Sequence, residues 1–101
     1  MRILLFFDLP TITTEHQKAY RGFVKSLKKE GFYMLQESVY VKMAINNQIA
    51  EGTLNRVKGI MPKEGSIMTL TITEKQFASM NVFIGEKNSD IINTIDRVVK
   101  L

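Results

Sequence analysis

The feature that most constrains the fold is an apolar run near the N-terminus that ends on an acid. Residues 2–8 read RILLFFD, and Pro10 follows two positions after Asp8. A continuous apolar segment of this length is typical of a central β-strand whose two faces are both covered. We therefore predict a strand over residues 2–8, with Asp8 at the rim of the sheet beside the loop that follows.

Helical and strand patterns alternate in the next part of the chain. Thr14, followed by Gln17 three positions later, predicts a capping box at the start of a helix, and Gly31 is placed to end that helix. Residues 32–43 are rich in β-branched and aromatic side chains but long for one strand. We expect two short strands there, or one strand bent near residues 36–38.

The second half of the chain is predicted to contain an amphipathic helix over residues 47–58, a strand over residues 65–73, a turn or single helical turn at residues 73–77, and a strand over residues 80–85. This order predicts an α+β, ferredoxin-like βαββαβ sandwich, with helices on one face of an antiparallel sheet. We assign residues 1–79 to that domain. Residues 80–101 then supply C-terminal strands that complete a partner's sheet in a homodimer, and a tail.

Length and composition exclude several classes of protein. The 101 residues suit one domain, and the chain has no cysteine, so disulfides and thiolate metal sites are excluded. The longest apolar run, Ile3–Phe7, is too short to span a bilayer and lacks the cleavage site of a signal peptide. We expect a soluble, cytoplasmic protein with no membrane partner.

Asp8 admits two interpretations. In the first, its carboxylate accepts backbone N–H groups of the following loop, as Asp often does before turns. In the second, it is a ligand for Mg²⁺, which prefers carboxylate oxygen. No other acid lies near Asp8 in the sequence. An isologous dimer interface would bring Asp8 to face its symmetry mate, and a shared cation would relieve their repulsion and polarise a phosphodiester.

His16, the only histidine, lies in the first turn of the first predicted helix. One interpretation makes it a proton donor in phosphodiester cleavage. The other makes it an exposed side chain with no catalytic role, because nothing else in the sequence orients it.

The first predicted helix separates an apolar face from a basic face. Its apolar face is formed by Ala19, Tyr20, Phe23, Val24 and Leu27. The opposite face, which we call the basic face, carries Lys18, Arg21, Lys25, Lys28 and Lys29. Acids stand only at the helix ends, whereas a face that serves solubility normally mixes both signs. The basic face is therefore either a solvated surface or a contact for nucleic-acid phosphates.

Four segments, in this order and spacing, resemble a known family: LLFFDLP, KAYRGFVKSLKKEGF, LQESVYVK and LTITEKQF. The apolar strand ending in Asp8, the residues Gln36, Ser38 and Val39, and the run from Thr73 to Phe77 together resemble the CRISPR-associated Cas-two (Cas2) family, the small partner of the spacer-acquisition integrase. The resemblance covers about residues 2–85. The final run is most similar to members from type II systems.

The resemblance implies a ferredoxin-like homodimer that exchanges C-terminal strands. It implies Mg²⁺-dependent nuclease activity on RNA or DNA, attributed to the strand-end aspartate, here Asp8. It also implies that the homodimer bridges two dimers of the CRISPR-associated integrase of the Cas-one family and holds duplex DNA for insertion.

Three functions stay open from the sequence. The first is a Mg²⁺-dependent phosphodiesterase at paired Asp8 residues, and the second is a structural DNA-binding scaffold without catalysis. The third, a ferredoxin-like sensor of small molecules, ranks last because the loop DLPTITT contains no glycine for a ligand-binding turn.

Overall fold

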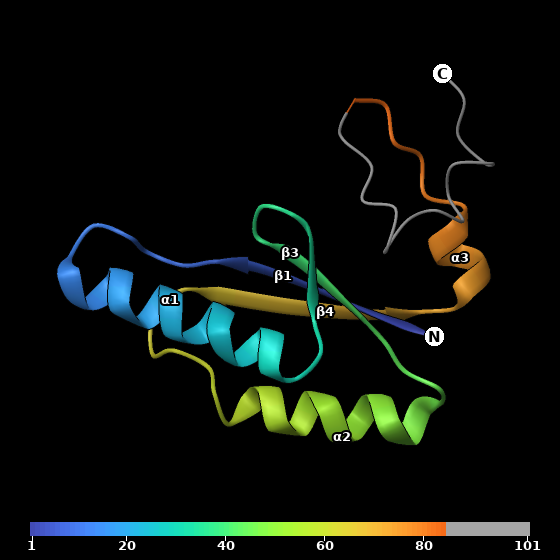
Figure 1. The fold of residues 1–101 in the computed structure, drawn as a ribbon, viewed down its shortest axis with the longest axis horizontal. Coiled ribbons are helices and arrows are strands. Elements are labelled where there is room, and N and C mark those ends of the chain that lie inside the picture. Colours follow the sequence, from blue (N-terminus) through green and yellow to red (C-terminus); the bar gives the residue numbers. More distant parts are fainter. Residues whose placement is uncertain (85–101) are drawn as a thin grey trace.

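The structure, a computed structural model, describes residues 1–84. Its elements are β1 (Arg2–Asp8), α1 (Thr14–Lys29), β2 (Tyr33–Gln36), β3 (Val39–Met43), α2 (Asn47–Lys58), β4 (Ser66–Ile72) and α3 (Glu74–Ala78). The sheet has the order β2-β3-β1-β4, and every neighbouring pair is antiparallel. In Figure 1, α1 and α2 lie on one side of this sheet. The predicted ferredoxin-like α+β fold is confirmed.

Alternation along β1 divides the core into two layers. Ile3, Leu5 and Phe7 point towards α1 and α2 and are buried in the larger cluster of apolar side chains. The Phe7 ring lies 5.6 Å from the Phe23 ring and 5.7 Å from the Tyr20 ring, in edge-to-face geometry. Aromatic pairs favour this arrangement, so the strand and the first helix pack in one orientation. Successive side chains of a strand point to opposite faces, so Leu4 faces away from the helices.

Among residues 1–84, those that cover the second face of the sheet gather at one end. There α3 places Phe77, which is 1% exposed, against Leu4 and Val41. Arg2 fastens α3 to the sheet: its Nε donates to both carboxylate oxygens of Glu74, at 3.0 and 2.8 Å, and its guanidinium lies 4.6 Å from the centre of the Phe77 ring. The ion pair lowers the pKa of the Glu74 carboxyl. The five-residue α3 confirms the predicted single helical turn.

Two local predictions need correction. The first helix is capped by Thr13, not Thr14: the Thr13 hydroxyl accepts from the His16 backbone N–H at 3.0 Å. His16 takes the place that we assigned to Gln17 in the capping box, and the Gln17 side chain donates instead to the Thr11 carbonyl at 3.1 Å. Thr13 and Thr14 have the same capping chemistry, so the residue type alone does not distinguish them.

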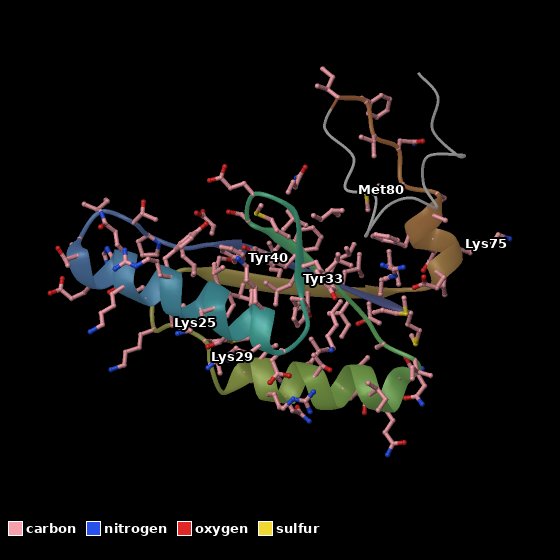
Figure 2. All side chains as sticks on the ribbon, in the orientation of Figure 1. Lys25, Lys29, Tyr33, Tyr40, Lys75 and Met80 are labelled. Carbon is pink, nitrogen blue, oxygen red and sulfur yellow. The ribbon has the colours of Figure 1, made fainter. Side chains whose placement is uncertain are left out.

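The other boundaries follow the predictions. Gly31, at φ 95°, ends the first helix, and two short strands meet at a turn where Ser38 has φ 66°. Residues 80–84 form no strand in this single chain, and Gly85 and the tail lie outside the described residues. Figure 2 shows Met80 beside α3. Pairing of this segment with a partner's sheet needs a second protomer and stays a prediction.

Candidate functional site

Asp8 is the last residue of β1 and pairs with Ser66 of β4. Its side chain is exposed, and it has the parity of Leu4 and Phe6, which face away from the helices. Within residues 1–84 its carboxylate accepts no hydrogen bond and forms no ion pair. The loop-capping interpretation is therefore wrong, and both carboxylate oxygens are open to solvent on the second face.

The surface beside Asp8 is apolar. The neighbouring register pairs are Phe6 with Met68 and Leu4 with Leu70, and Met68 and Leu70 are 64% and 54% exposed. The exposed methionine and leucine side chains lie on one face of the strand and form an apolar patch that is open to solvent. Asp8 therefore stands at the rim of an open apolar face, which we define by Phe6, Met68 and Leu70.

Residues 1–84 of one protomer offer too few ligands for a metal ion. In the described part of the chain, no group of three or more His, Cys, Asp or Glu side chains is arranged to hold a metal. The Asp8 carboxylate has the hard oxygen chemistry that Mg²⁺ prefers, and Mg²⁺ commonly keeps several waters beside one or two carboxylates. The donor type fits Mg²⁺, and within residues 1–84 Asp8 has no second carboxylate beside it.

Backbone contacts fix the position of Asp8. The Phe7 N–H donates to the Ser38 carbonyl at 3.0 Å, which attaches the end of β1 to the turn between β2 and β3. On the other side Gly65, at φ 111°, lies so close that an added Cβ would be 2.7 Å from the Asp8 carbonyl oxygen and 2.6 Å from the Leu9 side chain. Sequence reasoning missed both contacts. A glycine directly before a strand was the only local signal for the second.

The His16 side chain is neither free to donate a proton to a substrate nor fully exposed to solvent. Its side chain is 23% exposed and both ring nitrogens are engaged. Nδ1 accepts from the Thr13 N–H at 3.4 Å, and Nε2 lies 3.1 Å from Glu64 Oε2. Since Nδ1 is the acceptor, the neutral ring carries its proton on Nε2 and donates it to Glu64. No ring nitrogen is left for substrate, so this geometry does not support a catalytic role.

His16 and Asp8 are not brought into one site. The imidazole lies in the helical layer, beside a cleft of about 340 Å³ between the start of α1 and the connection from α2 to β4. Leu9, Pro10 and Tyr20 are among the residues that line this cleft. The Asp8 side chain belongs to the opposite face of the sheet.

The basic face is present as predicted. All five of its side chains are exposed, and within residues 1–84 none of them forms an ion pair. They are Lys18, Arg21, Lys25, Lys28 and Lys29. Figure 2 shows Lys25 and Lys29 on α1, away from the sheet. Phe23 and Leu27 are buried on the opposite side of the helix, whereas Ala19, predicted on the apolar face, is exposed. The basic face can contact phosphates without moving any core residue.

No helix within the described residues is long and apolar enough to cross a membrane.

Comparison with known proteins gives consistent matches. The model of a family described as CRISPR associated protein Cas2 matches residues 1–80. The chain is similar to the CRISPR-associated endoribonuclease Cas2 of Streptococcus mutans serotype c, at 48% identity over all 101 residues and 93% of that protein. It is similar to the proteins of the same name from Treponema denticola and Ligilactobacillus salivarius, at 43% and 41% identity over the full length of both chains.

A solved structure agrees in fold. The crystal structure of Streptococcus pyogenes Cas2 at pH 6.5 superposes with a TM-score of 0.64, covering 84% of this chain and all of that chain. Their sequences are 21% identical, so this likeness bears on the fold alone.

Proposed function

The chain belongs to the CRISPR-associated Cas2 family, and from that membership we propose that it is a CRISPR adaptation protein with Mg²⁺-dependent endonuclease activity. In this proposal a homodimer bridges dimers of the Cas-one integrase and holds duplex DNA during spacer integration, and its paired Asp8 residues cleave RNA or DNA phosphodiesters. The observation that carries it is the place of Asp8, exposed and without a protein partner in the described residues, at the rim of the open apolar face.

The open apolar face supports a dimer. Met68 and Leu70 are largely exposed in one chain, and covering them removes apolar surface from water at about 25 cal/mol per Å². A second copy of the chain is the occupant we propose, because a two-fold axis places the same apolar patch on both sides of the interface. Asp8 stands at the rim of that patch, and in the proposed dimer the two-fold axis passes beside it, so that the two Asp8 residues face each other.

Paired carboxylates support the metal chemistry. Two Asp8 side chains that face each other repel, and a shared cation removes that cost. Bound Mg²⁺ would supply a Lewis acid that polarises the scissile phosphodiester. The carboxylates themselves would hold and orient the ion, while the apolar side chains beside them limit access of water to the interface. The relatives named as endoribonucleases favour RNA as the cleaved substrate.

A scaffold without catalysis is the second candidate. The basic face lies in the helical layer, on the other side of the sheet from Asp8, so duplex DNA on α1 does not contact Asp8 of the same chain. This separation favours two independent functions, one of which needs only shape and positive charge.

The Asp8→Asn variant tests the proposal. Asparagine keeps the size of the side chain and removes its charge. We expect the dimer to stay folded, because the repulsion between two carboxylates is relieved, and Mg²⁺-dependent cleavage of labelled RNA to be lost. Binding of duplex DNA should be unchanged. Cleavage at the wild-type rate by highly purified Asp8→Asn protein would eliminate the catalytic site and leave the scaffold.

A further inference from the structure

Three successive residues at the start of β4 lie against the first helix and the Asp8 end of β1. Glu64 pairs with His16, Gly65 lies so close to Asp8 and Leu9 that it has no room for a Cβ, and Ser66 pairs with Asp8 across the sheet. In Figure 1 the connection from α2 passes beneath α1 before it enters β4. The loop that follows Asp8 is therefore held at its beginning by Gly65 and Ser66.

The same loop is held at its far end by His16. The Thr13 N–H donates to Nδ1 of His16, and the Thr13 hydroxyl accepts from the His16 N–H. Nε2 then donates to Glu64, 48 positions further along the chain. We call the His16–Glu64 pair, together with the Thr13 cap, the clamp. It joins the far end of residues 9–13 to the connection that leads into β4.

The Asp8 carboxylate depends on this support because it makes no side-chain bond of its own within residues 1–84. Its direction follows from the backbone at the end of β1 and from the loop behind it. A shared metal site across a dimer axis tolerates little error, because a displacement of about 1 Å costs on the order of a hundredfold in rate. Each shift of the strand end would also act twice, once in each protomer.

We propose that His16 and Glu64 are positioning residues for the reaction at Asp8, an inference that rests on the proposed function. They touch neither metal nor substrate. They act through the loop, by keeping the end of β1 and the start of β4 in one arrangement, so that the two Asp8 carboxylates meet at the separation a single ion needs.

The chain offers matched variants. Glu64→Ala removes the acceptor, whereas Glu64→Gln keeps an oxygen that accepts from Nε2. His16→Gln breaks the pair with Glu64 but retains the cap, since glutamine occupies the same position in the Thr73 capping box, where its side chain accepts from the Thr73 N–H at 2.8 Å. Loss of the cap and loss of the His16–Glu64 pair are thereby separated.

The experiment measures Mg²⁺-dependent cleavage of labelled RNA by the full-length protein, with amide hydrogen exchange of residues 9–13 and Asp8→Asn in parallel. We expect Glu64→Ala and His16→Gln to accelerate exchange in the loop, to lower kcat between about tenfold and a hundredfold, and to raise the Mg²⁺ concentration for half-maximal activity, with KM for RNA unchanged. Glu64→Gln should restore most of the activity.

Three results would overturn the inference, and they are distinguishable. If Asp8→Asn abolishes cleavage while Glu64→Ala and His16→Gln keep the wild-type kcat and Mg²⁺ dependence, the clamp is structural only and the proposed function stands. If Asp8→Asn leaves cleavage intact, the proposed catalytic site fails and the positioning role fails with it. Unchanged loop exchange in both clamp variants also contradicts the proposal.

Discussion

Asp8 and Ser66 are partners in the register of β1 and β4, and the pairs Phe6–Met68 and Leu4–Leu70 follow them along the same face of the sheet. This register places a carboxylate with no protein partner in the described residues at the end of an apolar strip. This strip accounts for the sequence of β1, which is apolar on both faces and ends on Asp8. One side packs on helices, and the other is completed by a partner in the function proposed above.

Changing Leu70 to Glu should prevent dimer formation. Leu70 lies in the open apolar face, and burying a carboxylate without a partner costs several kcal/mol. Sedimentation velocity over a range of concentrations measures the effect. Thr69→Glu is the matched control, because Thr69 is the neighbouring residue of β4 with the opposite parity. A Leu70→Glu protein that dimerises as tightly as the Thr69→Glu protein would rule out this face.

Reversing three charges of the basic face should weaken binding of duplex DNA. With Lys18, Arg21 and Lys25 changed to Glu, we expect lower affinity and a shallower salt dependence, by about 0.9 in the logarithmic slope for each phosphate that the variant no longer neutralises. Preference among DNA sequences should not change, because phosphate contacts do not read bases. Fluorescence anisotropy at several salt concentrations measures both quantities.

A second triple variant controls for net charge. Lys58, Lys63 and Lys75 are exposed and lie outside α1, and their change to Glu alters the net charge by the same amount. Equal loss of binding in the two triple variants would mean that DNA responds to total charge and not to the basic face.

The Glu74–Arg2 pair should stabilise the fold only above acidic pH. The pair lowers the pKa of Glu74 from its usual value near 4.5, so this stabilisation is complete above pH 4.5 and disappears as the pH falls through the lowered pKa. Half of the Glu74 side chain is exposed, so we expect Glu74→Gln to cost no more than about 1 kcal/mol at pH 7. Urea unfolding from pH 7 to pH 3 tests this, and a wild-type advantage that persists at pH 3 would refute it.

Replacing Gly65 with Ala should destabilise the Asp8 end of the sheet. The added Cβ meets the Asp8 carbonyl and Leu9 at less than 3 Å, and the backbone lies at φ 111°, so we expect a cost of roughly 1–3 kcal/mol in urea unfolding. Gly22→Ala is the control, because a Cβ there meets nothing within 4 Å and the helix should gain about 0.5–1 kcal/mol. Equal stability of the two variants would show that the close approach at Gly65 relaxes without cost.

Local patterns in the sequence determined most of the fold. The predicted element boundaries lie within one or two residues of the observed ones at β1, at the turn between β2 and β3, and at the end of the first helix. The signals for these elements lie inside the elements themselves, in the run from Ile3 to Phe7 and at Gly31. The basic face could also be predicted from the sequence, since helical periodicity alone places its five cations on one side of the helix. The position of Asp8 at a strand end followed from the sequence as well.

The tertiary structure decided what surrounds those residues. The pairs His16–Glu64 and Arg2–Glu74 join residues 48 and 72 positions apart, and no local pattern encodes them. The choice of Thr13 over Thr14 as the cap was also left to the tertiary structure, because the two side chains have the same capping chemistry. The tertiary structure also decided that Asp8 lies on the face of the sheet without α1 and α2. Side chains alternate between the two faces of a strand, and only packing selects which alternate set faces the helices.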